Sequence, residues 1–163
     1  MARDRFDASP VPNVHPVRRI MPFIMPTKNG AFVLFEHDIP TAPLLGFLAE
    51  VNRTRPADRP VTMFHCVLRA IGIALGEFPR LNRYVSGSRL YARKAIWLAF
   101  SAKQRLERDA PLFTAKIELR PEEPLGPFVD RVLDMLGEGR SGKESAADDE
   151  VATIGFADLH KTS

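Results

Sequence analysis

The side chains in this sequence that could do chemistry are few and poorly placed for it. Its one cysteine, Cys66, lies between Phe64 and Leu68 in the most apolar stretch, whereas a nucleophilic cysteine needs a polar, electropositive and partly open setting. The four histidines are His15, His37, His65 and His160, and no two of them have the spacing of metal ligands. We therefore expect Cys66 to pack in the core, the histidines to be surface or helix-end residues, and no metal to bind.

Residues 137–144, GEGRSGKE, nearly match the phosphate-binding loop G-x-x-x-x-G-K-[ST]. Glu144 replaces the hydroxyl residue that would reach the metal, and its negative charge would lie beside the phosphates. The segment also follows a predicted helix, whereas the motif requires a strand before it and a helix after it. We interpret it as a solvated loop rather than a nucleotide site.

The length and composition are those of one ordinary globular domain. The 163 residues are enough to bury a real core, and 45% of them are hydrophobic and 26% charged. The net charge of +3 is small, and no run of lysine and arginine is interleaved with aromatic residues, so nothing indicates nucleic acid. No apolar run approaches the ~20 residues of a membrane span, and the charged N-terminus is not a secretory signal. A single cysteine excludes a disulfide within the chain and favours a cytoplasmic location.

The N-terminal half is expected to contain extended and helical segments in turn. Residues 1–19 are polar and rich in proline, so we predict an extended arm there rather than a packed element. Residues 31–39 follow a turn signal and contain the unbroken apolar run 32–35, which predicts a strand covered on both faces at one end. The next predicted element is an amphipathic helix that follows Thr41, with an apolar stripe formed by Leu44, Phe47, Leu48 and Val51.

The longest apolar stretch, residues 63–78, predicts a helix at the centre of the domain. It is hydrophobic almost all round, which in a soluble protein is typical of a buried helix, and Pro79 ends it. Gly72 and Gly76 lower its helix propensity by roughly 1 kcal/mol each relative to alanine. We therefore expect another segment of backbone to pack closely against the helix at those two turns.

The C-terminal half predicts strands followed by a helix. The predicted elements are a hairpin of residues 82–85 and 89–93, a central strand at 96–102, a strand with one wet face at 112–119, and a helix at 124–136 that Gly137 and Gly139 end. Residues 140–163 form a polar tail that we expect to be poorly ordered or loosely docked. This order predicts an α/β (α+β) two-layer sandwich, with helices packed on one face of a mixed sheet.

Taken together, these segments resemble the coenzyme A-dependent acyltransferase superfamily, which contains the catalytic domains of 2-oxo acid dehydrogenase complexes and chloramphenicol acetyltransferase. The long helix followed by Pro79-Arg80-Leu81-Asn82 is similar to the family's helix that ends in Pro-x-Leu-Asn. Residues 17–27 are similar to the family's opening arginine-containing helix, and residues 95–103 to one of its apolar strands. The likeness covers only the first half to two thirds of the family's domain. It therefore implies an incomplete chloramphenicol acetyltransferase-like fold, with the N-terminal portion of the catalytic domain at residues 20–139.

The resemblance implies acyl transfer between coenzyme A and a thiol, of the dihydrolipoamide acyltransferase type, with acyl-coenzyme A as substrate and no metal. In the family, the histidine of a C-terminal His-x-x-x-Asp-Gly motif is the general base, and a serine or threonine in another motif stabilises the oxyanion. Neither motif is in this sequence, and His160 lies too close to Ser163 to begin the first. We therefore expect a truncated form that has no catalytic residue of the family and is inactive alone. The alternative is a non-catalytic trimerising or scaffold relative of the same fold.

The resemblance also assigns supporting residues and partners. Arg18 or Arg19 matches the arginine that pairs with the aspartate of the motif, and Phe23 and Met25 would lie near the substrate channel. The expected partners are other copies of the chain, as a homotrimer or larger assembly, or a complementing C-terminal half. A lipoyl-bearing protein is a further expected partner, whereas nucleic acid and membranes are not.

Overall fold

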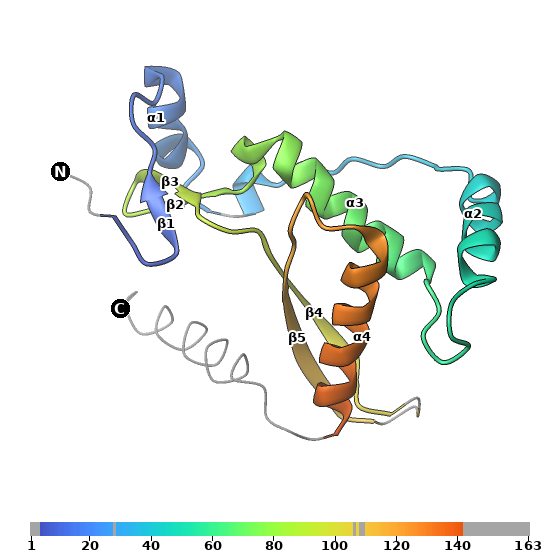
Figure 1. Ribbon diagram of the computed structural model, residues 1–163. Coiled ribbons are helices and arrows are strands. Elements are labelled where there is room, and N and C mark those ends of the chain that lie inside the picture. Colours follow the sequence, from blue (N-terminus) through green and yellow to red (C-terminus); the bar gives the residue numbers. More distant parts are fainter. Residues whose placement is uncertain (1–3, 28, 106, 108–109, 142–163) are drawn as a thin grey trace.

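The computed structural model describes residues 4–27, 29–105, 107 and 110–141, and it shows a mixed α and β fold (Figure 1). In chain order the elements are β1 (Ala8–Pro10), α1 (Pro16–Ile24), the 3-10 helix η1 (Asn29–Ala31), α2 (Ala42–Asn52), α3 (Met63–Glu77), the 3-10 helix η2 (Pro79–Leu81), β2 (Arg83–Ser86), β3 (Arg89–Arg93), β4 (Trp97–Lys103), β5 (Leu112–Glu118) and α4 (Leu125–Arg140). The strands form two antiparallel sheets, β1-β3-β2 and β4-β5. The prediction of a single mixed sheet is therefore wrong for the described residues, because every strand pair among them is antiparallel and the strands form two separate sheets.

The β4-β5 pair carries the core of the domain. On β5, Phe113, Ala115 and Ile117 are buried and the residues between them are more exposed, which confirms the predicted strand with one wet face. The buried core consists of Leu48 from α2, Val61, Leu68 from α3, Ile117 and Leu119 at the end of β5, and Phe128, Val129 and Val132 from α4. Helix α4 packs against β5 and α3 packs against α4, whereas α2 contacts α3 and lies away from the β4-β5 pair (Figure 1).

Helix α3 has the predicted limits but not the predicted burial. Its buried residues are His65, Leu68 and Gly72. Phe64, Val67 and Ile73 on its other side are 41–50% exposed, although Phe64 contacts the ring of Phe100 on β4 with a centroid distance of 5.1 Å. The prediction of a helix buried all round is therefore wrong, because the described segments cover only one face of α3.

The glycines of α3 lie where the chain after β5 passes close to the helix. A Cβ on Gly76 would lie 2.7 Å from the Cβ and Cγ of Pro121, and a Cβ on Gly72 would lie 3.2 Å from the Cβ of Leu119. The guanidinium of Arg69, also on α3, donates to the backbone carbonyl of Pro121. The expected close approach of another segment to these two turns of α3 is confirmed. The atoms that come close belong to the side chains of Leu119 and Pro121, which follow β5.

The N-terminal segment takes part in the smaller sheet. β2 and β3 are joined by a tight turn at Gly87 and Ser88, both with positive φ, as in the predicted hairpin. β1 pairs with the other edge of β3, and the side chain of Ala8 is fully buried there. Part of the predicted extended arm, residues 1–19, is therefore a packed strand, and α1 begins at Pro16 within the same range.

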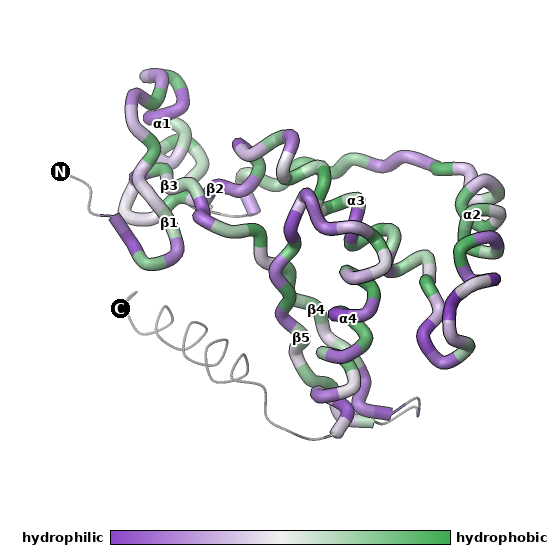
Figure 2. Tube along the Cα trace, in the orientation of Figure 1, coloured by the Kyte–Doolittle hydropathy of each residue, from purple (hydrophilic) through white to green (hydrophobic). Residues whose placement is uncertain are grey.

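The predicted strand at residues 31–39 is not formed. η1 ends at Ala31, and the residues that follow have no regular structure, with Phe32, Val33, Leu34 and Phe35 between 71% and 85% exposed. Figure 2 shows this hydrophobic stretch in the connection between η1 and α2. A strand needs a neighbouring strand for its backbone hydrogen bonds, and none of the described strands pairs with this segment.

Helix α4 continues past the glycines that were predicted to end it. It runs to Arg140, and Gly139 is buried against Phe113 of β5, whose ring a Cβ at this position would overlap. Gly139 therefore serves close packing of α4 on β5 and does not stop the helix. Residues 137–141 of the near-match to a phosphate loop form the end of α4 and its C-cap, whereas its last three residues and most of the predicted tail, residues 142–163, lie outside the described residues.

Candidate functional site

The residues assigned to an active site by resemblance all lie on or next to α1. Arg18, Arg19 and Phe23 are within the helix, and Met25 follows its last residue. Arg19 and Phe23 are four positions apart and share one side of the helix. Arg18 and Arg19 are exposed, Phe23 is 66% exposed, and neither arginine has an ion pair among the described residues.

Local sequence explains why α1 forms and where it is weak. The Nδ1 of His15 accepts a hydrogen bond from the backbone N–H of Val17 at 3.3 Å, and Pro16 occupies a first-turn position that favours proline. Pro22 cannot donate a backbone hydrogen bond, which weakens the last turn. No residue of α1 is buried, so the helix presents both its arginines and its hydrophobic side chains to solvent.

His65 is a buried titratable side chain of the core. It is 3% exposed, and its Nδ1 accepts a hydrogen bond from the backbone N–H of Thr62 at 3.1 Å. Burial lowers the pKa of His65, and the charge of Arg55 lowers it further. The expectation of a helix-end histidine is confirmed, whereas its burial was not foreseen. His65 is a neutral capping residue in this setting and not a proton donor at the surface.

Cys66 has the properties of a packing residue. Its side chain is partly buried against the core cluster, and burial raises the pKa of its thiol. A raised pKa lowers the fraction of reactive thiolate. The structure therefore agrees with the interpretation of Cys66 as a core residue.

A cluster of ion pairs fixes the chain between α2 and α3. Arg55 and Arg59 both donate to Asp130 of α4, and Arg59 Nη2 also lies 2.8 Å from Asp134 Oδ1. In the sequence this segment, residues 53–60, is polar and contains no recognisable motif. The available signal was the spacing of Asp130 and Asp134, which places both carboxylates on one side of α4.

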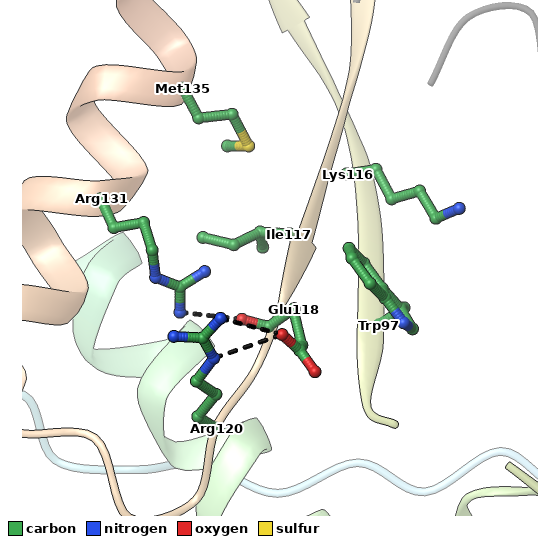
Figure 3. A pocket seen from close by; sticks show the side chains of 7 residues that line it. All are labelled: Trp97, Lys116, Ile117, Glu118, Arg120, Arg131 and Met135. Atoms are coloured by element: carbon green, nitrogen blue, oxygen red, sulfur yellow. Dashed lines mark hydrogen bonds and ion pairs between the residues drawn. The ribbon is translucent and has the colours of Figure 1, made fainter. Parts of the chain in front are cut away.

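A shallow cavity of about 200 Å³ lies at the edge of β5 near the start of β4 (Figure 3). Its lining residues are Trp97, Lys116, Ile117, Glu118, Arg120, Arg131 and Met135. Arg120 donates to the Glu118 carboxylate at 3.2 Å, and Arg131 donates to the Glu118 backbone carbonyl at 2.9 Å. Lys116 lies over the Trp97 ring, 5.1 Å from its centroid. Arg120 and Arg131 are thus already bonded to Glu118, and among the described residues that line the cavity no nucleophile lies beside a base.

The described part of the chain offers little for metal or membrane binding. Nowhere in it do three or more histidine, cysteine or acidic side chains gather in a way that could hold a metal ion. None of the helices in the same part combines the length and hydrophobicity needed to cross a membrane.

Comparisons with known proteins relate this chain to others through its structure. No protein-family model matches the sequence, and no curated protein matches it significantly. The structure is similar to that of a protein described as a probable dihydrolipoamide acetyltransferase from Listeria monocytogenes 4b F2365, with a TM-score of 0.61 and 19% sequence identity. The match covers 86% of this chain and 59% of the Listeria chain, so this chain spans less than two thirds of that protein. The chain thus shares the fold of this part of the Listeria protein.

Proposed function

We propose that the chain is an acyltransferase-type protein related to the dihydrolipoamide acyltransferases of 2-oxo acid dehydrogenase complexes. The observation that carries this proposal is the shared fold with the Listeria protein over 86% of the chain. The order of segments around Pro79-Arg80-Leu81-Asn82 supports it independently. In this proposal the fold is the N-terminal part of a chloramphenicol acetyltransferase-like sandwich, and the reaction moves an acyl group between coenzyme A and a thiol.

The catalytic groups of that reaction come from outside this chain in our proposal. Acyl transfer to a thiol needs a base within hydrogen-bond reach of the thiol and a donor aimed at the developing oxyanion. No His-x-x-x-Asp-Gly motif is present in the sequence, and His65 is buried as a cap. In this proposal Arg18 or Arg19 forms an ion pair with the aspartate of a complementing C-terminal half. Phe23 and Met25 line the substrate channel.

The exposed stretch 32–35 supports the need for a partner polypeptide. Four consecutive hydrophobic side chains at 71–85% exposure are unusual for a monomeric surface. A neighbouring strand would both cover them and satisfy the backbone between η1 and α2. We propose a complementing half or further copies of the chain, in a homotrimer or larger assembly, as that neighbour, with acyl-coenzyme A and a lipoyl-bearing protein as cytoplasmic reaction partners.

The second candidate is a non-catalytic trimerising or scaffold relative of the same fold. Two observations favour it. The sequence lacks the histidine motif, and neither Arg18 nor Arg19 has an ion pair among the described residues. In this case the exposed stretch serves assembly alone.

An acyl-transfer assay with and without a complement separates the two candidates. The purified chain is mixed with acetyl-coenzyme A and dihydrolipoamide, and the S-acetyl product is measured by mass spectrometry. We expect no product from the chain alone. Product should appear when a C-terminal half carrying the His-x-x-x-Asp-Gly motif is added, and not when the histidine of that half is replaced by alanine. Arg18→Ala or Arg19→Ala in this chain should then reduce the restored rate.

Other results would change the conclusion. Turnover by the chain alone would contradict the proposal that its catalytic groups come from elsewhere. A stable oligomer that neither binds a complement nor forms product would favour the scaffold candidate.

A further inference from the structure

A second cavity, of about 240 Å³, lies between the C-terminal end of α3, η2 and the β2-β3 hairpin. Its apolar wall is formed by Leu75, Gly76, Pro79, Ala92, Ala95 and Ile96. Asn82, Arg83, Arg93 and Lys94 complete the lining, and no acidic residue is among the described residues that line it. The cavity is therefore a mostly hydrophobic space with basic residues at its boundary.

The strand register places Arg83 on the side of β2 that belongs to the cavity. Arg83 lies opposite Ala92 of β3, which also lines the cavity. Tyr84, the next residue, points to the opposite face of the sheet, where it stacks on Tyr91 at a centroid distance of 5.6 Å. Arg83 thus enters the space between the hairpin and α3.

The other two basic residues direct their charges elsewhere. The Arg93 guanidinium lies over the Tyr84 ring, 4.6 Å from its centroid, on the face away from the cavity. Lys94 Nζ lies 2.9 Å from Asp4 Oδ2 and also donates to the backbone carbonyl of Arg5. Among the described residues that line the cavity, Arg83 is therefore the basic residue whose charge is available to a ligand there.

The Nε of Arg83 is a buried donor without a hydrogen-bond partner among the described residues. Buried polar groups are nearly always hydrogen-bonded, because a donor removed from water without an acceptor is destabilising. A ligand that brings an acceptor would satisfy it once the Arg83 side chain rotates toward the cavity, because the Nε has almost no accessible surface in its present position. A carboxylate is the best match, since the planar guanidinium donates to both oxygens of a carboxylate at once.

We propose that this cavity binds a small monocarboxylate with a compact hydrophobic body. The carboxylate accepts from Arg83, and the body packs against Leu75, Pro79 and Ile96. The volume exceeds the roughly 150 Å³ of a cavity that is known to hold benzene, so an aromatic or branched acid fits. The nearby C-terminal end of α3 carries partial negative charge, which disfavours a phosphate dianion more strongly than a singly charged carboxylate. The proposal does not depend on the acyltransferase function.

Calorimetric titration of the full chain with benzoate tests this site. We expect saturable binding of one benzoate per chain, and at least tenfold weaker binding of benzamide, which has the same body without the charge, and of inorganic phosphate. Arg83→Met should weaken benzoate binding at least tenfold without lowering the melting temperature, because it removes an unpartnered buried donor. Arg89→Met, on an exposed residue of the same hairpin, is the matched control and should leave binding unchanged.

A cavity-filling variant tests the same site independently, in case Arg83→Met does not fold. Ala92→Leu places a larger side chain directly opposite Arg83 and should abolish benzoate binding while the guanidinium remains. The proposal is overturned if benzoate does not bind, if either variant binds it as well as the original chain, or if benzamide or phosphate binds as tightly.

Discussion

Asp130 of α4 accepts a hydrogen bond from the guanidinium of Arg55, although the two residues lie 75 positions apart in the sequence. The Arg55 side chain is 15% exposed, and it also donates to the Arg59 backbone carbonyl at 2.9 Å. This contact fastens the segment between α2 and α3 to α4. It is therefore one of the interactions that hold three separate helices in one arrangement.

The carboxylate of Asp130 should make stability depend on pH in the acid range. Hydrogen bonds from Arg55 and Arg59 lower the pKa of Asp130 in the folded state. A depressed pKa stabilises the fold at pH values above that of the unfolded group, about 3.9, and the contribution is lost as pH falls through the folded pKa. We expect Asp130→Asn to lower the urea midpoint at pH 7 and to have a smaller effect at pH 3. Asp134→Asn, on a more exposed carboxylate, should have the smaller effect at pH 7. Equal midpoints for Asp130→Asn and the original chain at pH 7 would refute a stabilising role for this pair.

His65 should make stability depend on pH near neutrality. Its folded-state pKa is lowered, so the unfolded chain binds a proton more readily than the folded chain. The fold is then most stable above the unfolded pKa of about 6.5 and loses stability as pH falls below it. His65→Gln keeps an acceptor for the Thr62 N–H, as in a capping box, but does not titrate. We expect the variant to lose most of the change in melting temperature between pH 7 and pH 5.

An exposed histidine provides the control for that experiment. His37→Gln replaces a side chain on the exposed segment after η1 and should leave the pH profile unchanged. If His65→Gln keeps the full profile of the original chain, a different group causes the pH dependence.

Two glycines in helices should respond to alanine in opposite directions. A Cβ on Gly76 would lie 2.7 Å from two atoms of Pro121, whereas nothing lies within 4 Å of a Cβ on Gly46. We expect Gly76→Ala to reduce the free energy of unfolding by about 1–3 kcal/mol, as in other overpacked sites. Gly46→Ala should raise it by about 0.5–1 kcal/mol, since alanine is the better helix former. Chemical denaturation of both variants measures the difference, and a stabilising Gly76→Ala would show that Pro121 does not pack as described.

The exposed stretch 32–35 should influence association and not the stability of the domain. Phe35 is 85% exposed, so Phe35→Ser should change the free energy of unfolding by less than about 0.5 kcal/mol. The same change should shift the sedimentation profile toward smaller species, because it removes hydrophobic surface that a partner would cover. Leu45→Ser, at an exposed residue of α2, is a control for general hydrophobicity. An unchanged profile for Phe35→Ser would separate this stretch from assembly.

Local patterns in the sequence were sufficient for much of the fold. The alternation around Phe113 and Ile117 predicted β5, the turn at Gly87 predicted the β2-β3 hairpin, and Pro79 marked the end of α3. Each of these depends on neighbouring residues alone. The stretch 32–35 failed because its hydrophobicity indicated a strand, whereas strand formation depends on a second segment that the local pattern does not contain.

Other features could not be predicted from the sequence because they depend on packing between residues that are distant along the chain. Gly139 looked like a helix stop, but its missing side chain makes room for the ring of Phe113. Arg83 carried no signal at all, because its importance depends on the hairpin register and on the end of α3. The structure places Arg18 and Phe23, two of the residues assigned by resemblance, on the same helix, α1. Their role in an active site is a proposal.

The side chain of Asn52 has a consequence for engineering this protein. Its amide nitrogen donates to the Val61 carbonyl at 2.9 Å and its oxygen accepts from the Val61 N–H at 2.8 Å, so the two ends of the intervening loop are clasped together. Arg55 and Arg59 anchor the loop again, which leaves Ala57 and Asp58 as an exposed tip. A fluorescent label or affinity tag inserted at this tip would report on assembly without disturbing the packing of α2, α3 and α4.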